Sequence, residues 1–162
     1  RNKGKHVSSY HQDLKVGILG GGQLGRMLIQ SGIDFNIPFL VLDPDPSAPC
    51  STLARFSCGK LTDYQTVMEF GSACDLITIE IENVNTKALK DLEAMGKKVF
   101  PQPHIIEMIQ DKRQQKAFYR DNGIPTAEFH LTDNAADVRR HVHPRHAGDR
   151  RWCRRCSSRR SF

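Results

Sequence analysis

A glycine-rich turn constrains the fold of this chain more than any other feature of its sequence. Residues 15–19 form a short apolar run of the kind that buried strands have. Gly20-Gly21-Gly22-Gln23-Leu24-Gly25 follows at once and fits the pattern G-x-G-x-x-G, and residues 23–33 then carry apolar side chains near helical spacing. A strand, a glycine turn and a helix in this order indicate the first unit of a parallel α/β sheet.

The chain continues to alternate between predicted strands and helices as far as residue 138. The later predicted strands cover residues 39–42, 55–58, 76–81 and 98–100. Helices are predicted to begin near Thr62 or Asp63, and near Asn85, Pro103 and Asp111. Strands that alternate with helices through short loops pair in parallel, so we expect an α/β fold: a Rossmann-like parallel sheet with flanking helices.

The glycine turn suits the binding of a phosphate group. Without a Cβ, the backbone N–H groups can approach an anion closely, and the helix N-terminus adds a partial positive charge. A tight strand-to-helix connection needs the same glycines, so both interpretations stay open. Asp43 follows Gly20 by 23 residues, near the spacing at which dinucleotide-binding enzymes hold a ribose hydroxyl. Pro44-Asp45-Pro46 after it equally favours a turn-forming aspartate.

Two carboxylates stand at the end of the fourth predicted strand, in Glu80-Ile81-Glu82-Asn83. Open α/β sheets bind ligands at this carboxyl edge. Alternation along a strand predicts Glu80 and Glu82 on one side, about 7 Å apart, with Ile81 opposite. The two carboxylates would then accept hydrogen bonds from ribose hydroxyls or from an exocyclic amine. A solvated strand end that leads into the Asn85 cap is the alternative.

The positive charge of the chain is concentrated at its C-terminal end. Residues 139–162 hold nine arginines and one acidic residue, which gives them a charge of +8 and leaves residues 1–138 at −2. This distribution argues against a basic groove spread over a fold, although an arginine-rich arm would bind nucleic acid non-specifically. Cys153-x-x-Cys156 and three nearby histidines leave a zinc site as a less favoured alternative. The tail also has the composition that a frameshift in a GC-rich gene would give.

The composition excludes several classes of protein. No apolar run approaches the roughly 18–20 residues of a membrane span, so we predict that the chain is not an integral membrane protein. Residues 1–14 are polar, without periodicity and without the apolar core of a secretory signal, and they are predicted to be disordered. The five cysteines do not make a disulfide framework in a chain of 162 residues, which favours a reduced, cytoplasmic setting.

Several consecutive segments resemble one enzyme family, in the same order along the chain. They are VGILGGGQLGRM at 16–27, VLD at 41–43, TIEIENV at 78–84, QDKRQQK at 110–116 and GIPTA at 123–127. Together they resemble the start of the 5-(carboxyamino)imidazole ribonucleotide synthases, which are ATP-grasp ligases, over about residues 15–138. The resemblance stops there.

The resemblance implies a domain organisation and a function. Residues 15–110 would be the Rossmann-like pre-ATP-grasp domain, residues 111–138 the start of the ATP-grasp domain, and residues 139–162 an unstructured or frameshifted tail on a truncated enzyme. The implied activity is the ATP-dependent carboxylation of aminoimidazole ribonucleotide by bicarbonate in de novo purine biosynthesis. The family further implies a cytoplasmic homodimer.

The resemblance also implies site residues. Those that would bind the ribonucleotide are Gly22, Gln23, Leu24, Gly25, Glu80 and Glu82. The first four would lie against its phosphate or ribose, and the two glutamates near the sugar or the imidazole. Lys112 would contact ATP, although a solvated lysine on a polar helix is the alternative. The second glycine-rich loop and the acidic Mg²⁺ ligands of the family have no counterpart, so we assign no catalytic or metal-binding residue and expect this chain to be inactive by itself.

Two other functions stay open. In an NAD(P)-dependent oxidoreductase, Asp43 would hold the adenine ribose. A nucleic-acid-binding protein would act through its arginine-rich tail, and deletion of residues 139–162 would then abolish the binding.

Overall fold

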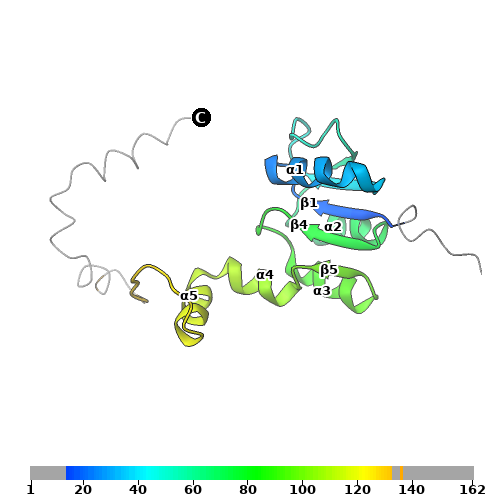
Figure 1. Cartoon of the computed structure of the whole chain (residues 1–162). Coiled ribbons are helices and arrows are strands. Elements are labelled where there is room, and N and C mark those ends of the chain that lie inside the picture. Colours follow the sequence, from blue (N-terminus) through cyan, green and yellow to red (C-terminus); the bar gives the residue numbers. More distant parts are fainter. Residues whose placement is uncertain (1–13, 133–135, 137–162) are drawn as a thin grey trace, which may run out of the picture. The chain divides into compact units, whose positions relative to one another are not determined.

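The computed structural model describes residues 14–132 and residue 136, and Figure 1 shows how its elements are arranged. In this part of the chain the strands are β1 Val16–Leu19, β2 Phe39–Asp43, β3 Arg55–Cys58, β4 Leu76–Ile79 and β5 Lys98–Phe100. They form one sheet in the order β3-β2-β1-β4-β5, and every neighbouring pair is parallel. The predicted α/β fold with a parallel sheet is confirmed. The predictions for residues 1–13 and for the arginine-rich tail lie outside the described residues.

Helices lie between most of the strands, and two of them each begin directly after a residue whose side chain caps them. They are α1 Gln23–Gly32, the 3-10 turn η1 Ile33–Phe35, α2 Tyr64–Ser72, α3 Thr86–Ala94, α4 Pro103–Gln110 and α5 Lys112–Asp121. Asp63 and Asn85 accept hydrogen bonds from the backbone N–H groups of Thr66 and Ala88, at 2.8 and 2.9 Å, as their N-cap positions predicted. α5 ends before Gly123, which has a φ of +64°.

The sheet buries a separate apolar cluster on each face. Because side chains alternate along a strand, Leu19 and Leu42 lie on the face that packs against α2, α3 and α4, where Leu89 is fully buried. Ile18 and Val41 lie on the opposite face, toward α1. Each fully buried side chain of this size contributes roughly 1.5–3 kcal/mol to the free energy of folding.

The order of the strands reverses between β1 and β4. The chain places β2 and β3 on one side of β1, and then returns to place β4 and β5 on the other side. Leu19 pairs with Ile79 at the carboxyl ends of β1 and β4, so Gly20 and Glu80 leave the sheet side by side. A crevice beside such a reversal is where open parallel sheets bind their ligands.

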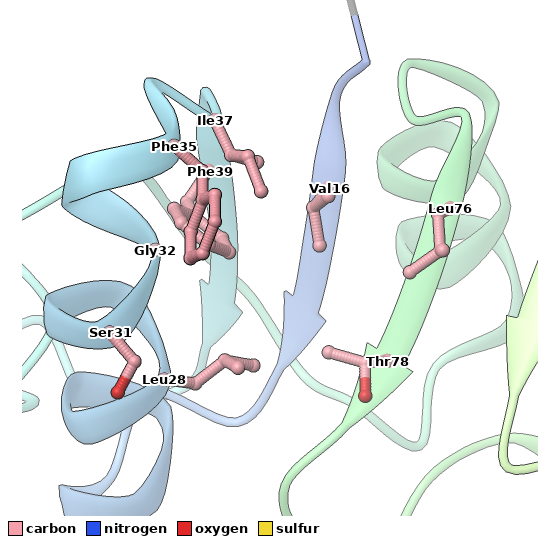
Figure 2. A pocket seen from close by; sticks show the side chains of 9 residues that line it. All are labelled: Val16, Leu28, Ser31, Gly32, Phe35, Ile37, Phe39, Leu76 and Thr78. Atoms are coloured by element: carbon pink, nitrogen blue, oxygen red, sulfur yellow. The ribbon is translucent and has the colours of Figure 1, made fainter. Parts of the chain in front are cut away.

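A hollow lies on the α1 face of the sheet, toward the amino ends of the strands, as Figure 2 shows. It has a volume of about 400 Å³ and is lined by Val16, Leu28, Ser31, Gly32, Phe35, Ile37, Phe39, Leu76 and Thr78. A Cβ on Gly32 would lie 2.5 Å from the Phe39 ring, so glycine admits this ring against α1. None of the lining side chains is titratable, and none belongs to the turn that follows β1.

The chain divides into two compact units after Gln115. In the second unit, Lys116 Nζ donates a hydrogen bond to Thr126 Oγ1 at 2.7 Å and lies over the rings of Tyr119 and Phe129. Among residues 14–132 and 136, no helix has the length and apolar character that crossing a bilayer requires.

Candidate functional site

The turn that follows β1, called here the glycine turn (residues 20–25), needs glycine for two reasons. Gly20 has a φ of +106°, in the left-handed region that side chains disfavour. A Cβ on Gly20 would also lie 2.7 Å from Glu80 Oε2, and a Cβ on Gly25 would lie 3.0 Å from the Gly20 carbonyl oxygen. The glycines therefore let the start of α1 and the end of β4 approach the turn closely.

Asp43 holds the glycine turn from behind. Its Oδ2 accepts a hydrogen bond from the Gly21 N–H at 2.6 Å, and its Oδ1 accepts one from the Asp45 N–H at 2.8 Å. The Gly21 carbonyl in turn accepts a hydrogen bond from the Cys50 N–H at 3.0 Å. Both carboxylate oxygens of Asp43 thus bind backbone amides, which favours the turn-forming interpretation of this residue over the ribose-binding one.

Glu80 closes the front of the glycine turn. Its N–H donates to the Leu19 carbonyl at 2.8 Å, which fixes its backbone beside the end of β1. Its half-buried carboxylate reaches over the turn, because a Cβ on Gly22 would lie 2.6 Å from Glu80 Oε1. The structure therefore brings together Gly22 and Glu80, two of the predicted site residues. It also places a carboxylate directly beside the glycine turn.

The N-terminus of α1 provides hydrogen-bond donors next to this carboxylate. The N–H groups of Gln23, Leu24 and Gly25 lie in the first turn of the helix, before intrahelical bonding begins, and Gly22 provides no side-chain cap. The side chains of Gln23 and Leu24 are exposed, whereas Gly25 is buried. These amides and the partial positive charge of the helix end suit an anion.

Glu82 lies elsewhere than the strand pattern predicted. β4 ends at Ile79, because β1 turns away at Gly20 and leaves no neighbouring strand for further pairing. The residues that follow form an acidic loop (residues 80–85), in which Glu82 is exposed. The expected alternation is wrong here: a Cβ on Gly20 would lie 3.1 Å both from Glu80 Cβ and from Ile81 Cγ2, so these consecutive side chains both lie beside the turn.

Lys112, the predicted ATP contact, is the first residue of α5 and is exposed. It follows Asp111, whose Oδ1 accepts a hydrogen bond from the Arg113 N–H at 2.9 Å. Hydrogen bonds from the backbone N–H of Gln114 and then of Arg113 lower the pKa of Asp111. Within the part of the chain that the structure describes, no hydrogen bond or ion pair joins Lys112 to the glycine turn.

The buried thiol behind the turn is not suited to nucleophilic chemistry. Cys50 Sγ lies 3.5 Å from the Gly22 carbonyl oxygen. Burial, followed by the negative charges of Glu80 and Asp43, raises the pKa of this thiol. Residues 14–132 and 136 contain no group of three or more His, Cys, Asp or Glu side chains placed to hold a metal ion. The zinc alternative of the sequence concerns residues outside this part.

Comparisons with known proteins converge on one family. Residues 14–110 match the model of the ribonucleotide synthetase preATP-grasp domain. The chain is 38% identical over 125 residues to the phosphoribosylaminoimidazole carboxylase of Ogataea methanolica, a match that covers 75% of this chain and 23% of that protein.

Solved structures agree with the sequence matches. The N5-carboxyaminoimidazole ribonucleotide synthetase of Thermotoga maritima superposes with a TM-score of 0.69 at 35% identity, over 78% of this chain and 36% of that one. The N5-carboxyaminoimidazole synthase of Aspergillus clavatus, solved with ADP and 5-aminoimidazole ribonucleotide, gives a TM-score of 0.62 at 41% identity, over 72% of this chain and 31% of that one. The chain thus spans between about a quarter and a third of the length of these relatives.

Proposed function

The chain belongs to the family of ribonucleotide synthetase preATP-grasp domains and corresponds to the N-terminal portion of the N5-carboxyaminoimidazole ribonucleotide synthases, and from this premise we propose that the crevice between β1 and β4 binds 5-aminoimidazole ribonucleotide. The observation that carries the proposal is the Glu80 carboxylate lying against Gly20 and Gly22. The Aspergillus relative, solved with this ribonucleotide, supports the choice of ligand.

The charges around the glycine turn match a ligand with one anionic end and one donor-bearing end. The N–H groups of Gln23, Leu24 and Gly25 suit a single phosphate. The Glu80 carboxylate accepts hydrogen bonds from ribose hydroxyls or from the exocyclic amine of the imidazole. A dinucleotide would instead need Asp43 for its adenine ribose, and both carboxylate oxygens of Asp43 already accept hydrogen bonds from backbone amides.

In the proposed role, this chain's residues bind and orient the ribonucleotide for ATP-dependent carboxylation. Glu80 accepts a hydrogen bond from the amine and so holds the nitrogen that is to be carboxylated, while the first turn of α1 holds the phosphate. ATP, when bound, supplies the phosphoryl group that activates the carboxyl donor. Among the described residues we assign only the exposed Lys112 to ATP, and these residues form no cluster for Mg²⁺, so we assign no step to either.

The remaining expectations are part of the same proposal. Glu82 contributes to the sugar or imidazole end, and Lys112 contributes to ATP binding. Residues 15–110 act as the pre-ATP-grasp domain, and residues 111–138 begin the ATP-grasp domain. Bicarbonate as the carboxyl donor, a homodimeric state, and the absence of turnover by this chain alone stay predictions.

Calorimetry on the full chain tests the proposal with two ligands and two matched variants. We expect the wild-type chain to bind 5-aminoimidazole ribonucleotide more tightly than NADH. Glu80→Gln should weaken this binding by about ten- to a hundredfold, because hydrogen bonds to a charged acceptor contribute roughly 1.5–3 kcal/mol. Glu93→Gln makes the same chemical change at an exposed position of α3 and should leave the affinity unchanged.

Gly22→Val gives an independent test of the same site. A side chain at this position meets the Glu80 carboxylate, but the φ of −73° at Gly22 leaves the backbone unstrained, so the variant should fold. We expect it to lose ribonucleotide binding. Tight NADH binding without ribonucleotide binding by the wild type, or full affinity in folded Gly22→Val, would refute the proposal.

A further inference from the structure

We propose that Gln110 is a positioning residue, which holds the acidic loop in place at the edge of the ribonucleotide site. This inference rests on the proposed function and extends it to a residue far from Glu80 in sequence. Gln110 is the last residue of α4, and its side-chain Nε2 donates hydrogen bonds to the carbonyl oxygens of Glu82 at 2.7 Å and Val84 at 2.9 Å.

The two carbonyl oxygens require a side-chain atom that donates hydrogen bonds and does not accept them. Two carbonyl oxygens face one atom, and the amide nitrogen of glutamine carries two N–H groups that satisfy both. The same Glu82 carbonyl oxygen also accepts a hydrogen bond from the Val84 N–H at 2.9 Å. The turn in the middle of the loop and the Gln110 side chain therefore share this acceptor.

Through the Glu82 carbonyl, Gln110 acts on the part of the loop that other contacts leave least constrained. At the start of the loop, Glu80 is bonded to β1. At its end, Val84 is buried in the core, and Asn85 is bonded through its N–H to Leu61 and through Nδ2 to Thr62. Residues 81–83 between these anchors have exposed side chains. The orientation of Glu82 therefore depends on the tether at its own carbonyl.

The helix that carries Gln110 is itself fixed, which makes it an effective anchor. Ile106 is buried in the core, and Glu107 pairs with Lys90 of α3 at 2.7 Å. The residue after Gln110 is Asp111, which caps α5, and Lys112 follows. The tether thus connects the acidic loop to the point where the chain leaves the matched family domain at residue 110.

Gln110→Met tests the inference, because it keeps the length of the side chain and removes both donors without adding a charge. We expect the dissociation constant of the full chain for 5-aminoimidazole ribonucleotide to rise about tenfold, the effect of losing one to two net hydrogen bonds. The amides of residues 81–84 should exchange faster with deuterium. Gln102→Met makes the same change at the other end of α4, where no side-chain cap bond exists, and should alter neither quantity.

A double-mutant cycle separates positioning from a general loss of structure. If Gln110 acts through Glu82, then Gln110→Met should change the affinity less than twofold in a Glu82→Gln background. Full affinity in Gln110→Met, or an undiminished tenfold loss in the Glu82→Gln background, would overturn the inference and leave the proposed function standing. No ribonucleotide binding by the wild-type chain would overturn the proposed function and, with it, the positioning role.

Discussion

The glycine turn after β1 and the acidic loop after β4 leave neighbouring strands side by side, but they are held in place by different means. The turn is held through the backbone: Gly20 has a positive φ, and the Gly21 amide is bound by Asp43. The loop is held by side-chain amides: Gln110 reaches it from α4, and Asn85 at its end reaches out to the Thr62 carbonyl. One side of the site is therefore restricted by what the backbone tolerates, and the other by which distant side chains are present.

This difference predicts how the two sides respond to substitution. A change in the turn meets fixed atoms and strained dihedral angles, so it should lower both the stability of the fold and ligand binding. A change in the tether at Glu82 should lower binding with little loss of stability, because residues 81–83 of the loop are exposed and only Val84 lies in the core.

Gly20→Ala should have the largest effect on stability. Its Cβ adds the strain of a positive φ to a contact with Glu80, and we expect the free energy of unfolding to fall by about 3 kcal/mol. Gly96→Ala is the matched control, since Gly96 has a φ of +85° but nothing within 4 Å of its Cβ position. It should cost about 1–2 kcal/mol. Urea denaturation measures both, and equal losses would show that Glu80 does not press on the turn.

Asp43→Ala should have the next largest effect, because it leaves the N–H groups of Gly21 and Asp45 without their acceptor. We expect a loss of about 2 kcal/mol in the free energy of unfolding. Asp43→Asn retains one acceptor oxygen and should lose less. Both variants can be compared by urea denaturation, and a wild-type stability in Asp43→Ala would contradict the role of Asp43 as the support of the turn.

The smallest expected effect is a change in the pKa of the Cys50 thiol, which responds to the charge of Glu80. Burial raises the pKa of Cys50 and the Glu80 charge raises it further, so Glu80→Gln should lower this pKa toward its ordinary value. A raised pKa in the folded state means that the thiol's contribution to stability is complete below the unfolded value of about 8.5 and is lost as the pH rises through the folded value. The ¹³Cβ shift of labelled Cys50 gives the titration directly, with Glu93→Gln as the control. An unchanged pKa of Cys50 in the Glu80→Gln variant would show that the Glu80 carboxylate of the wild type lies away from the turn.

Much of the fold follows from signals that are local in sequence. Asp63 and Asn85 cap the helices that begin at the next residue, by accepting the N–H three residues ahead, and glycine at position 20 indicated a backbone that other residues disfavour. The pairing of Gly22 with Glu80 also follows, because parallel strands carry their carboxyl ends to one edge of the sheet.

What the sequence does not reveal depends on contacts between distant residues. Gln110 reaches carbonyls 26 and 28 residues away, and nothing near it in the sequence distinguishes it from the exposed Gln114. Two interpretations of Asp43 stayed open until its hydrogen bond to Gly21 was known. The end of β4 was misplaced by two residues, because the length of a strand depends on where its neighbour turns away.

The central position of β1 in the sheet determines when its strand pairs can form during synthesis. β1 is the first of the described strands to leave the ribosome, yet it pairs with β2 more than twenty residues later and with β4 sixty residues later, in the pair Val16 and Leu76. The side of β1 that pairs with β4 therefore stays unpaired in the nascent chain until β4 emerges. Contacts of such long sequence separation form slowly. The carboxyl ends of β1 and β4 cannot lie side by side before that moment, so the proposed ligand site forms only after both strands have left the ribosome.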